Sequence, residues 1–159
     1  MTKSCKLPWL INLLFLAIIL AMAYMFMLRG NTVASIDGRT AIVVTEPERQ
    51  LLLGEMRGFL EAIQEITEAA GEDDMATIAA VARKVGAAST TGVPVALMGK
   101  LPLEFKTLGF STHSLFDELA MNAETMGDSK TMIAGVATLL QNCTSCHAGY
   151  KIIAEQPEN

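Results

Sequence analysis

The chain has 159 residues, of which 51% are hydrophobic, and its 12 Lys and Arg against 17 Asp and Glu give a net charge of −5. This length is sufficient for one domain and a membrane anchor. Beyond residue 29, nine basic residues face seventeen acidic ones, a net charge of −8, which argues against nucleic acid as a partner and against docking on anionic lipid. The same charge permits a basic redox partner.

The first predicted element is a membrane anchor over residues 7–28. This run of 22 residues carries no charge, and as a helix it would be about 33 Å long, enough to cross a hydrocarbon core of about 30 Å. A cleaved signal peptide is the alternative, because residues 21–23 read Ala-Met-Ala, like a cleavage site. The apolar run continues past that point, whereas the apolar region of a signal peptide has about 7–15 residues. An uncleaved single-span anchor is therefore favoured.

The charges that flank the span indicate its orientation only modestly. Lys3 and Lys6 precede it and Arg29 follows it, so the positive-inside rule favours a cytoplasmic segment over residues 1–6. With this topology Cys5 stays on the reducing side of the membrane as a free thiol.

Residues 29–44 are expected to form a tether between the anchor and the domain. Turn sequences occupy residues 30–32 and 37–38. Residues 41–44, Ala-Ile-Val-Val, are short and β-branched, which predicts an extended segment. Because the sequence suggests no partner strand, we expect this arm to pack on the domain or on another protein.

Four amphipathic helices are predicted within the domain, residues 45–159. The first begins with a capping Thr45, with Pro47 in the first turn and with Glu48 completing a capping box. Turn residues and apolar spacing set the other boundaries. The predicted elements are helices over residues 45–70, 75–87, 111–126 and 128–153, a loop over residues 89–99 and a short helical turn over residues 101–106. Four such helices joined by mostly short links predict an all-α fold, an antiparallel four-helix bundle.

The fourth helix carries the most specific motif, Cys143-Thr144-Ser145-Cys146-His147. Two cysteines three positions apart lie on one helix face, and a histidine directly after them completes the attachment pattern of a c-type haem. Each thiol adds to one haem vinyl group, and His147 supplies the proximal iron ligand. A zinc site would need about four ligands, and a thioredoxin-like pair would begin a helix after a strand, so both alternatives are disfavoured.

Met56 is the candidate for the sixth iron ligand. In an up-down-up-down bundle, the start of the first helix and the end of the fourth lie at the same end, and Met56 lies at a depth that matches His147. The alternative is that Met56 is ordinary core packing beside an open iron. In that case Leu53, one turn earlier, is the residue that caps the open site.

Two further residues are assigned by their positions. Tyr150, one turn after His147, is expected to cover the haem edge. His113, expected at the start of the third helix, is interpreted as a capping or surface histidine, with a propionate contact or iron ligation as the alternatives.

Taken in order, these features resemble the four-helix cytochromes of the cytochrome c-prime type over roughly residues 45–153. The matching residues are CTSCH, Tyr150-Lys151, Leu101-Pro102, Phe105-Lys106, Phe116-Asp117-Glu118-Leu119-Ala120 and Gly127-Asp128. The resemblance implies a haem c inside an antiparallel bundle, with His147 as proximal ligand. Members of the family either leave the iron five-coordinate and bind NO or CO, or supply a methionine from the first helix and transfer electrons. The family often has an arginine on the first helix near the haem, and the resemblance therefore makes Arg49 the candidate for contact with a haem propionate, with a solvated surface arginine as the equal alternative.

The expected function is therefore electron transfer by a haem c protein in the bacterial inner membrane, with its C-terminal domain in the periplasm, where haem is attached to such motifs. A five-coordinate protein that senses gas or buffers NO is the alternative. The family is mostly soluble, so the anchor is a departure that suggests a membrane-bound or periplasmic redox partner; a homodimer is also compatible. Catalysis is not expected, because no acid–base pair or second metal cluster accompanies the motif.

Overall fold

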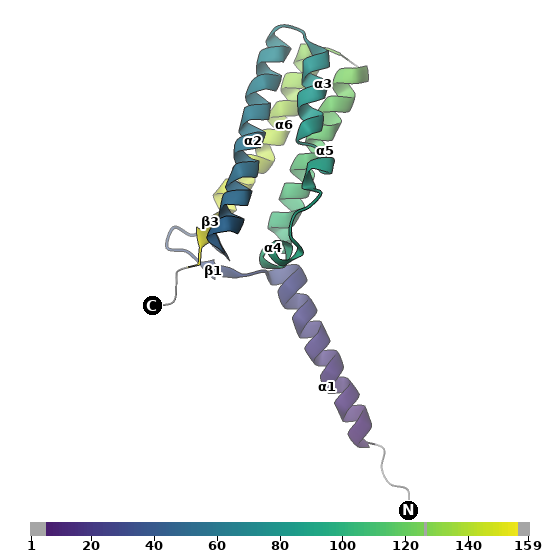
Figure 1. The fold of residues 1–159 in the computed structure, drawn as a ribbon, viewed down its shortest axis with the longest axis vertical. Coiled ribbons are helices and arrows are strands. Elements are labelled where there is room, and N and C mark those ends of the chain that lie inside the picture. Colours follow the sequence, from purple (N-terminus) through teal and green to yellow (C-terminus); the bar gives the residue numbers. More distant parts are fainter. Residues whose placement is uncertain (1–5, 126, 156–159) are drawn as a thin grey trace, which may run out of the picture.

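An apolar helix leads the chain into a mostly helical domain (Figure 1). The computed structural model describes residues 6–125 and 127–155. The expected cytoplasmic segment over residues 1–6, with Cys5, therefore falls almost wholly outside the described residues, and so does Met126, the expected end of the third helix.

The N-terminal helix projects away from the domain with its side chains exposed. Helix α1 (Lys6–Ala23) continues into a π-helical turn, η1 (Tyr24–Arg29). Residues 7–29 are exposed throughout and are long and apolar enough, by length and composition, to cross a membrane. These bounds agree with the span expected over residues 7–28.

The main apolar core is built from the four longer helices of the domain. These are α2 (Glu46–Gly71), α3 (Met75–Lys84), α5 (Leu103–Thr125) and α6 (Ser129–Gly149). Their fully buried side chains include Ile66, Ile78, Phe116 and Leu139. The predicted capping box is confirmed, because the Glu48 carboxylate accepts from the Thr45 backbone N–H at 2.8 Å while the Thr45 hydroxyl accepts from the Glu48 N–H.

The segment between α3 and α5 is more helical than expected. Residues 89–99 were expected to be a loop, but 3₁₀-helix η2 (Ala87–Thr90) and the six-residue helix α4 (Val95–Lys100) occupy most of this stretch. Leu97 of α4 is completely buried. Burial of this leucine explains why the segment folds back onto the domain.

Helix α5 begins at Leu103, well before the expected start at Ser111. Pro102 accounts for the early start, because its fixed φ suits the position that precedes a helix. Its carbonyl accepts from the Lys106 backbone N–H at 3.0 Å. The short turn expected over residues 101–106 is thus mostly the first turn of α5.

The residues that were expected to form a free extended arm and the end of the fourth helix form a small sheet instead. Strand β1 (Thr32–Ala34) pairs antiparallel with β2 (Thr40–Val44), and β2 pairs parallel with β3 (Tyr150–Ala154). Two expectations are therefore wrong: residues 41–44 do have a partner strand, and α6 ends at Gly149 instead of near residue 153. In the sheet, Ile42 and Val44 are completely buried. The free energy gained by burying these apolar side chains outweighs that of one more turn of α6.

The sheet, the start of α2 and α4 meet at the end of the domain where the N-terminal apolar helix, the expected anchor, joins it (Figure 1). There they share a second apolar cluster with the start of α5, here called the anchor-side cluster. It consists of Ile42, Val44, Leu52, Leu97, Leu101 and Phe105.

Candidate functional site

The CTSCH pentapeptide lies in the last turns of α6, and its two thiols face the interior. Cys143 and Cys146 are half-buried and free. Cys143 packs against the main core, while Cys146 packs against the anchor-side cluster. The two sulfur atoms therefore lie where the two apolar clusters meet, on one face of one helix.

The environment of the thiols disfavours their ionisation. Burial raises the pKa of Cys143, and burial, together with the repulsion that a second thiolate beside Cys143 would meet, raises the pKa of Cys146 to about 11. Within the described residues, no group of three or more His, Cys, Asp or Glu is placed to hold a metal ion by itself. A haem iron differs from such a metal site because the protein supplies only its axial ligands.

His147 lies on the outside of the same turn. Its side chain is exposed, and its ring makes no hydrogen bond with any residue that the structure describes. Its backbone carbonyl accepts from the Arg39 guanidinium at 3.4 Å. Arg39, just before β2, also pairs with Asp37 at 2.8 Å, so the β1–β2 turn is held against the end of α6.

Three of the predicted site residues, Cys146, Met56 and Tyr150, all pack against the anchor-side cluster. Two others, Leu53 and Arg49, do not. The Tyr150 ring meets Phe105 edge to face with centroids 5.6 Å apart. Leu53 is half-buried outside that cluster. Arg49 pairs with Glu46 along α2 at 3.5 Å.

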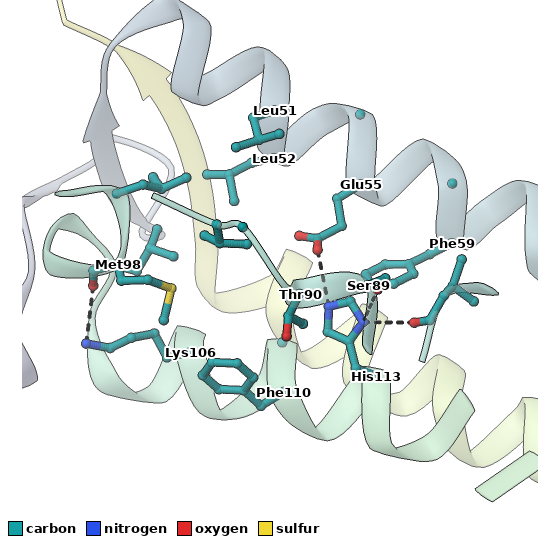
Figure 2. A pocket seen from close by; sticks show the side chains of 18 of the residues that line it. Leu51, Leu52, Glu55, Phe59, Ser89, Thr90, Met98, Lys106, Phe110 and His113 are labelled. Atoms are coloured by element: carbon teal, nitrogen blue, oxygen red, sulfur yellow. Dashed lines mark hydrogen bonds and ion pairs between the residues drawn. The ribbon is translucent and has the colours of Figure 1, made fainter. Parts of the chain in front are cut away.

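A cavity of about 710 Å³ lies beside the anchor-side cluster, between α2, α5 and the segment that joins α3 to α5 (Figure 2). Leu52, Leu97, Leu101 and Phe105 belong both to the cavity wall and to the cluster against which Cys146 packs. Neither Met56 nor any residue of α6 lines it. Cys146 and the cavity thus share apolar neighbours, although Cys146 itself does not line the cavity.

Three glycines inside helices open the cavity wall: Gly54 and Gly58 of α2 and Gly109 of α5. A Cβ added at Gly58 or Gly109 would meet nothing within 4 Å, and at Gly54 only the end of the Arg57 side chain at 3.7 Å. Glycine inside a helix costs about 0.5–1 kcal/mol relative to alanine. Packing within the described chain does not require these glycines, whereas a flat ligand lying against the helix backbones would.

His113 lines the inner end of this cavity, and the expectation of a surface or capping histidine at a helix start is wrong. It lies in the middle of α5 and is 3% exposed. Its Nε2 is 3.2 Å from the Glu55 carboxylate, and its Nδ1 lies 2.8 Å from the Val85 carbonyl (Figure 2). A helical signal was available in the sequence, because His113 shares a face with Phe116 and Ala120, which are both buried.

These contacts determine which ring nitrogen of His113 carries a proton and in which direction its pKa shifts. A carbonyl oxygen only accepts, so we assign a proton to Nδ1, and Nε2 then faces the Glu55 carboxylate. Burial lowers the pKa of His113, but the hydrogen bonds with Glu55 and the Val85 carbonyl together raise it above the ordinary value. The pair ties α5 to α2 across the cavity.

No family model, characterised protein or solved structure matches the chain. The site is therefore interpreted from its own chemistry.

The residues present fit a covalently attached haem. Two protonated thiols on one face of α6 are turned toward apolar side chains, and the imidazole that follows them has no hydrogen-bonding partner among the described residues. An apolar cavity, opened by glycines, shares its wall with the cluster that contacts Cys146. Two thiols, an exposed imidazole and an apolar cavity that shares side chains with the surroundings of Cys146 thus lie in this part of the domain.

Proposed function

We propose that the chain is a membrane-tethered electron-transfer protein that carries one haem c, resembling the cytochromes of the cytochrome c-prime type. One observation carries the proposal: the CTSCH pentapeptide lies in the last turns of α6 with both thiols turned inward, and Cys146 packs against the apolar cluster that forms part of the wall of a cavity of about 710 Å³. A surface disulfide would need exposed cysteines, and a solvated metal site would need thiolates. Half-buried thiols whose ionisation is disfavoured fit neither kind of site.

The proposed roles follow the positions of the side chains. Cys143 and Cys146 hold the haem through two thioether bonds, and His147 provides the proximal nitrogen. Met56, which packs in the same cluster as Cys146, is the proposed sixth ligand, since a thioether is a soft neutral donor that favours Fe(II). The bound haem supplies a one-electron Fe(III)/Fe(II) couple.

The apolar surroundings support electron transfer in particular. Leu52, Phe59 and Phe105 line the cavity, and side chains of this kind exclude water and lower the local dielectric, which tunes the reduction potential of a buried metal. His147 and Met56 would hold the iron with the same ligands in the oxidised and reduced states, which would limit the reorganisation that accompanies electron transfer.

Further parts of the proposal concern architecture and location. We propose that α2, α3, α5 and α6 form the antiparallel four-helix bundle of that family. The exposed apolar helix over residues 7–29 supports a single-pass anchor in the bacterial inner membrane, with the domain in the periplasm. A fixed tether suits a redox partner in the same membrane or one that meets the domain at its surface.

One observation favours a second candidate, a five-coordinate haem that binds NO or CO. Met56 does not line the cavity, whereas the apolar side chains of Leu52 and Phe59 do. If the part of the wall that faces the iron is formed by such side chains, the sixth position stays open to small gases.

Covalent attachment is tested first, on the full-length protein produced with haem maturation. The denatured protein should keep its haem and stain for peroxidase on a gel, and Cys143→Ser with Cys146→Ser should abolish the stain. Cys5→Ser is the matched control and should leave the stain unchanged. Extraction of the haem of the unmodified protein into acid–acetone would refute the proposal. A reduced-state spectrum recorded with and without CO then separates electron transfer from gas binding.

A further inference from the structure

The membrane anchor does not leave the domain through a free linker. Phe26 of η1 lies so close to Gly99 of α4 that an added Cβ would collide with the ring. Gly30, with φ of 65°, turns the chain against the backbone that follows Lys100, and the Asn31 N–H donates to the Lys100 carbonyl at 2.8 Å. The last turn of the anchor is therefore packed onto α4, part of whose other surface forms the cavity wall.

Lys106 connects this junction with the cavity. Its side chain lines the cavity, and its Nζ donates to the Met98 carbonyl at 3.4 Å (Figure 2). The same Nζ donates to the Met27 carbonyl at 2.9 Å. Met27 lies in the last turn of η1, where helix carbonyls lack helical partners. The ammonium nitrogen thus caps the last turn of the anchor, and the side chain that carries it lines the cavity.

The ammonium of Lys106 has capacity for one more partner, and that partner is expected to be an anion. Both of its observed partners are neutral carbonyls, while a lysine has three N–H donors. The ion pairs found in the described residues involve other cations. The other charged groups of the cavity wall, Glu55 and His113, already pair with each other.

Haem carries two propionate carboxylates, and a carboxylate that enters an apolar site is stable there only with a compensating charge or hydrogen bonds. We infer that Lys106 pairs with a haem propionate and so bridges the prosthetic group and the last turn of the membrane anchor. This inference rests on the proposed haem c function. It makes the anchor a part of the haem site, which holds the haem in one orientation to the membrane and presents it to a membrane-bound partner in one way.

The test uses the full-length, haem-loaded protein in detergent. Lys106→Met keeps the aliphatic stem and removes the charge, and Lys106→Arg keeps the charge. Lys100→Met is the matched control. Lys100 is a nearby lysine at the end of α4, but it does not line the cavity and it pairs with Glu48 at 2.7 Å and with Glu155 at 3.2 Å. The readouts are the midpoint potential and the propionate bands of the resonance Raman spectrum.

Lys106→Met should lower the midpoint potential, since a nearby positive charge favours the reduced iron. We expect the ratio of oxidised to reduced haem at a fixed ambient potential to rise about tenfold, which is 59 mV for one electron, and the propionate bands to shift. Lys106→Arg and Lys100→Met should leave the ratio within about twofold of the wild type.

Equal potentials and equal bands in Lys106→Met and Lys100→Met would overturn the inference and leave Lys106 as a cap of the anchor alone. If Lys106→Met loses its helical circular dichroism, Lys106→Gln provides the same comparison, since its amide still donates to the two carbonyls without the charge. A wild-type protein without covalent haem would refute the proposed function and this pairing with it, and the haem stain distinguishes that result from a failure of the pairing alone.

Discussion

Replacing Met56 by alanine separates the two candidate functions most directly. Met56 is partly buried and packs against the anchor-side cluster. A fully buried Met→Ala change costs about 2–5 kcal/mol, and because part of the Met56 side chain stays in solvent, we expect the lower part of that range, about 2–3 kcal/mol. For a domain of this size that is a fall in Tm of about 8–12 °C, so the variant should still fold.

The spectroscopic consequence of Met56→Ala is larger than its effect on stability. If Met56 is the sixth ligand, its loss converts a low-spin haem to a high-spin one, lowers the reduction potential and opens the iron to CO. The assay is the absorption spectrum of the oxidised and reduced protein, recorded before and after addition of CO, with the thermal transition measured in parallel.

Met75 provides the matched control for this experiment. It is also partly buried, but it packs against the main core and does not line the cavity, so Met75→Ala should cost a similar amount of stability while leaving the haem low-spin. A wild type that is already high-spin and binds CO, or a Met56→Ala protein that stays low-spin, would refute ligation by Met56. Gas binding would then replace electron transfer as the proposed function.

Three other outcomes are expected. Gly58→Leu adds a side chain to open space in the cavity wall, so the variant should fold but incorporate several-fold less haem. Gly71→Leu, at the end of α2 outside the wall, is the control and should incorporate normal amounts. Equal incorporation by both variants would contradict a haem ring in the cavity. The folded pKa of His113 lies above its ordinary value of 6.5, so the stabilisation by Glu55 is complete below that pH and is lost as the pH rises through the folded pKa. Glu55→Gln should therefore lower the Tm more at about pH 5.5 than at about pH 9, and a loss that is equal at both values would show that the pair does not titrate. N-terminal sequencing of the membrane-bound protein should find the intact start of the chain, and a mature protein that begins at Tyr24 would refute the anchor.

Features that depend on a few neighbouring residues were predictable from the sequence. The uncharged run over residues 7–28 requires only length and composition, and the capping box of Thr45 and Glu48 closes within three residues. The CTSCH pentapeptide is equally local, since it is recognised by the spacing of two thiols and an imidazole, and the haem attachment that it indicates stays a prediction.

Other features were decided by contacts between segments far apart in the chain. Residues 41–44 were correctly expected to be extended, but their pairing with β3 depends on bringing together strands more than 100 residues apart, and no local pattern encodes which strand pairs with which. That pairing also ended α6 at Gly149, because β-branched residues after it bury more surface in the sheet than in another turn of helix.

The site shows the same division. The thiols and His147 were identified by local spacing, whereas the common cluster of Cys146, Met56 and Tyr150 exists only because α2, α6 and β3 converge at the anchor end of the domain. His113 was misplaced because its partners, Glu55 and Val85, lie on other elements. The cavity that it lines is a property of volume left between packed helices, and such a volume is determined by tertiary packing alone.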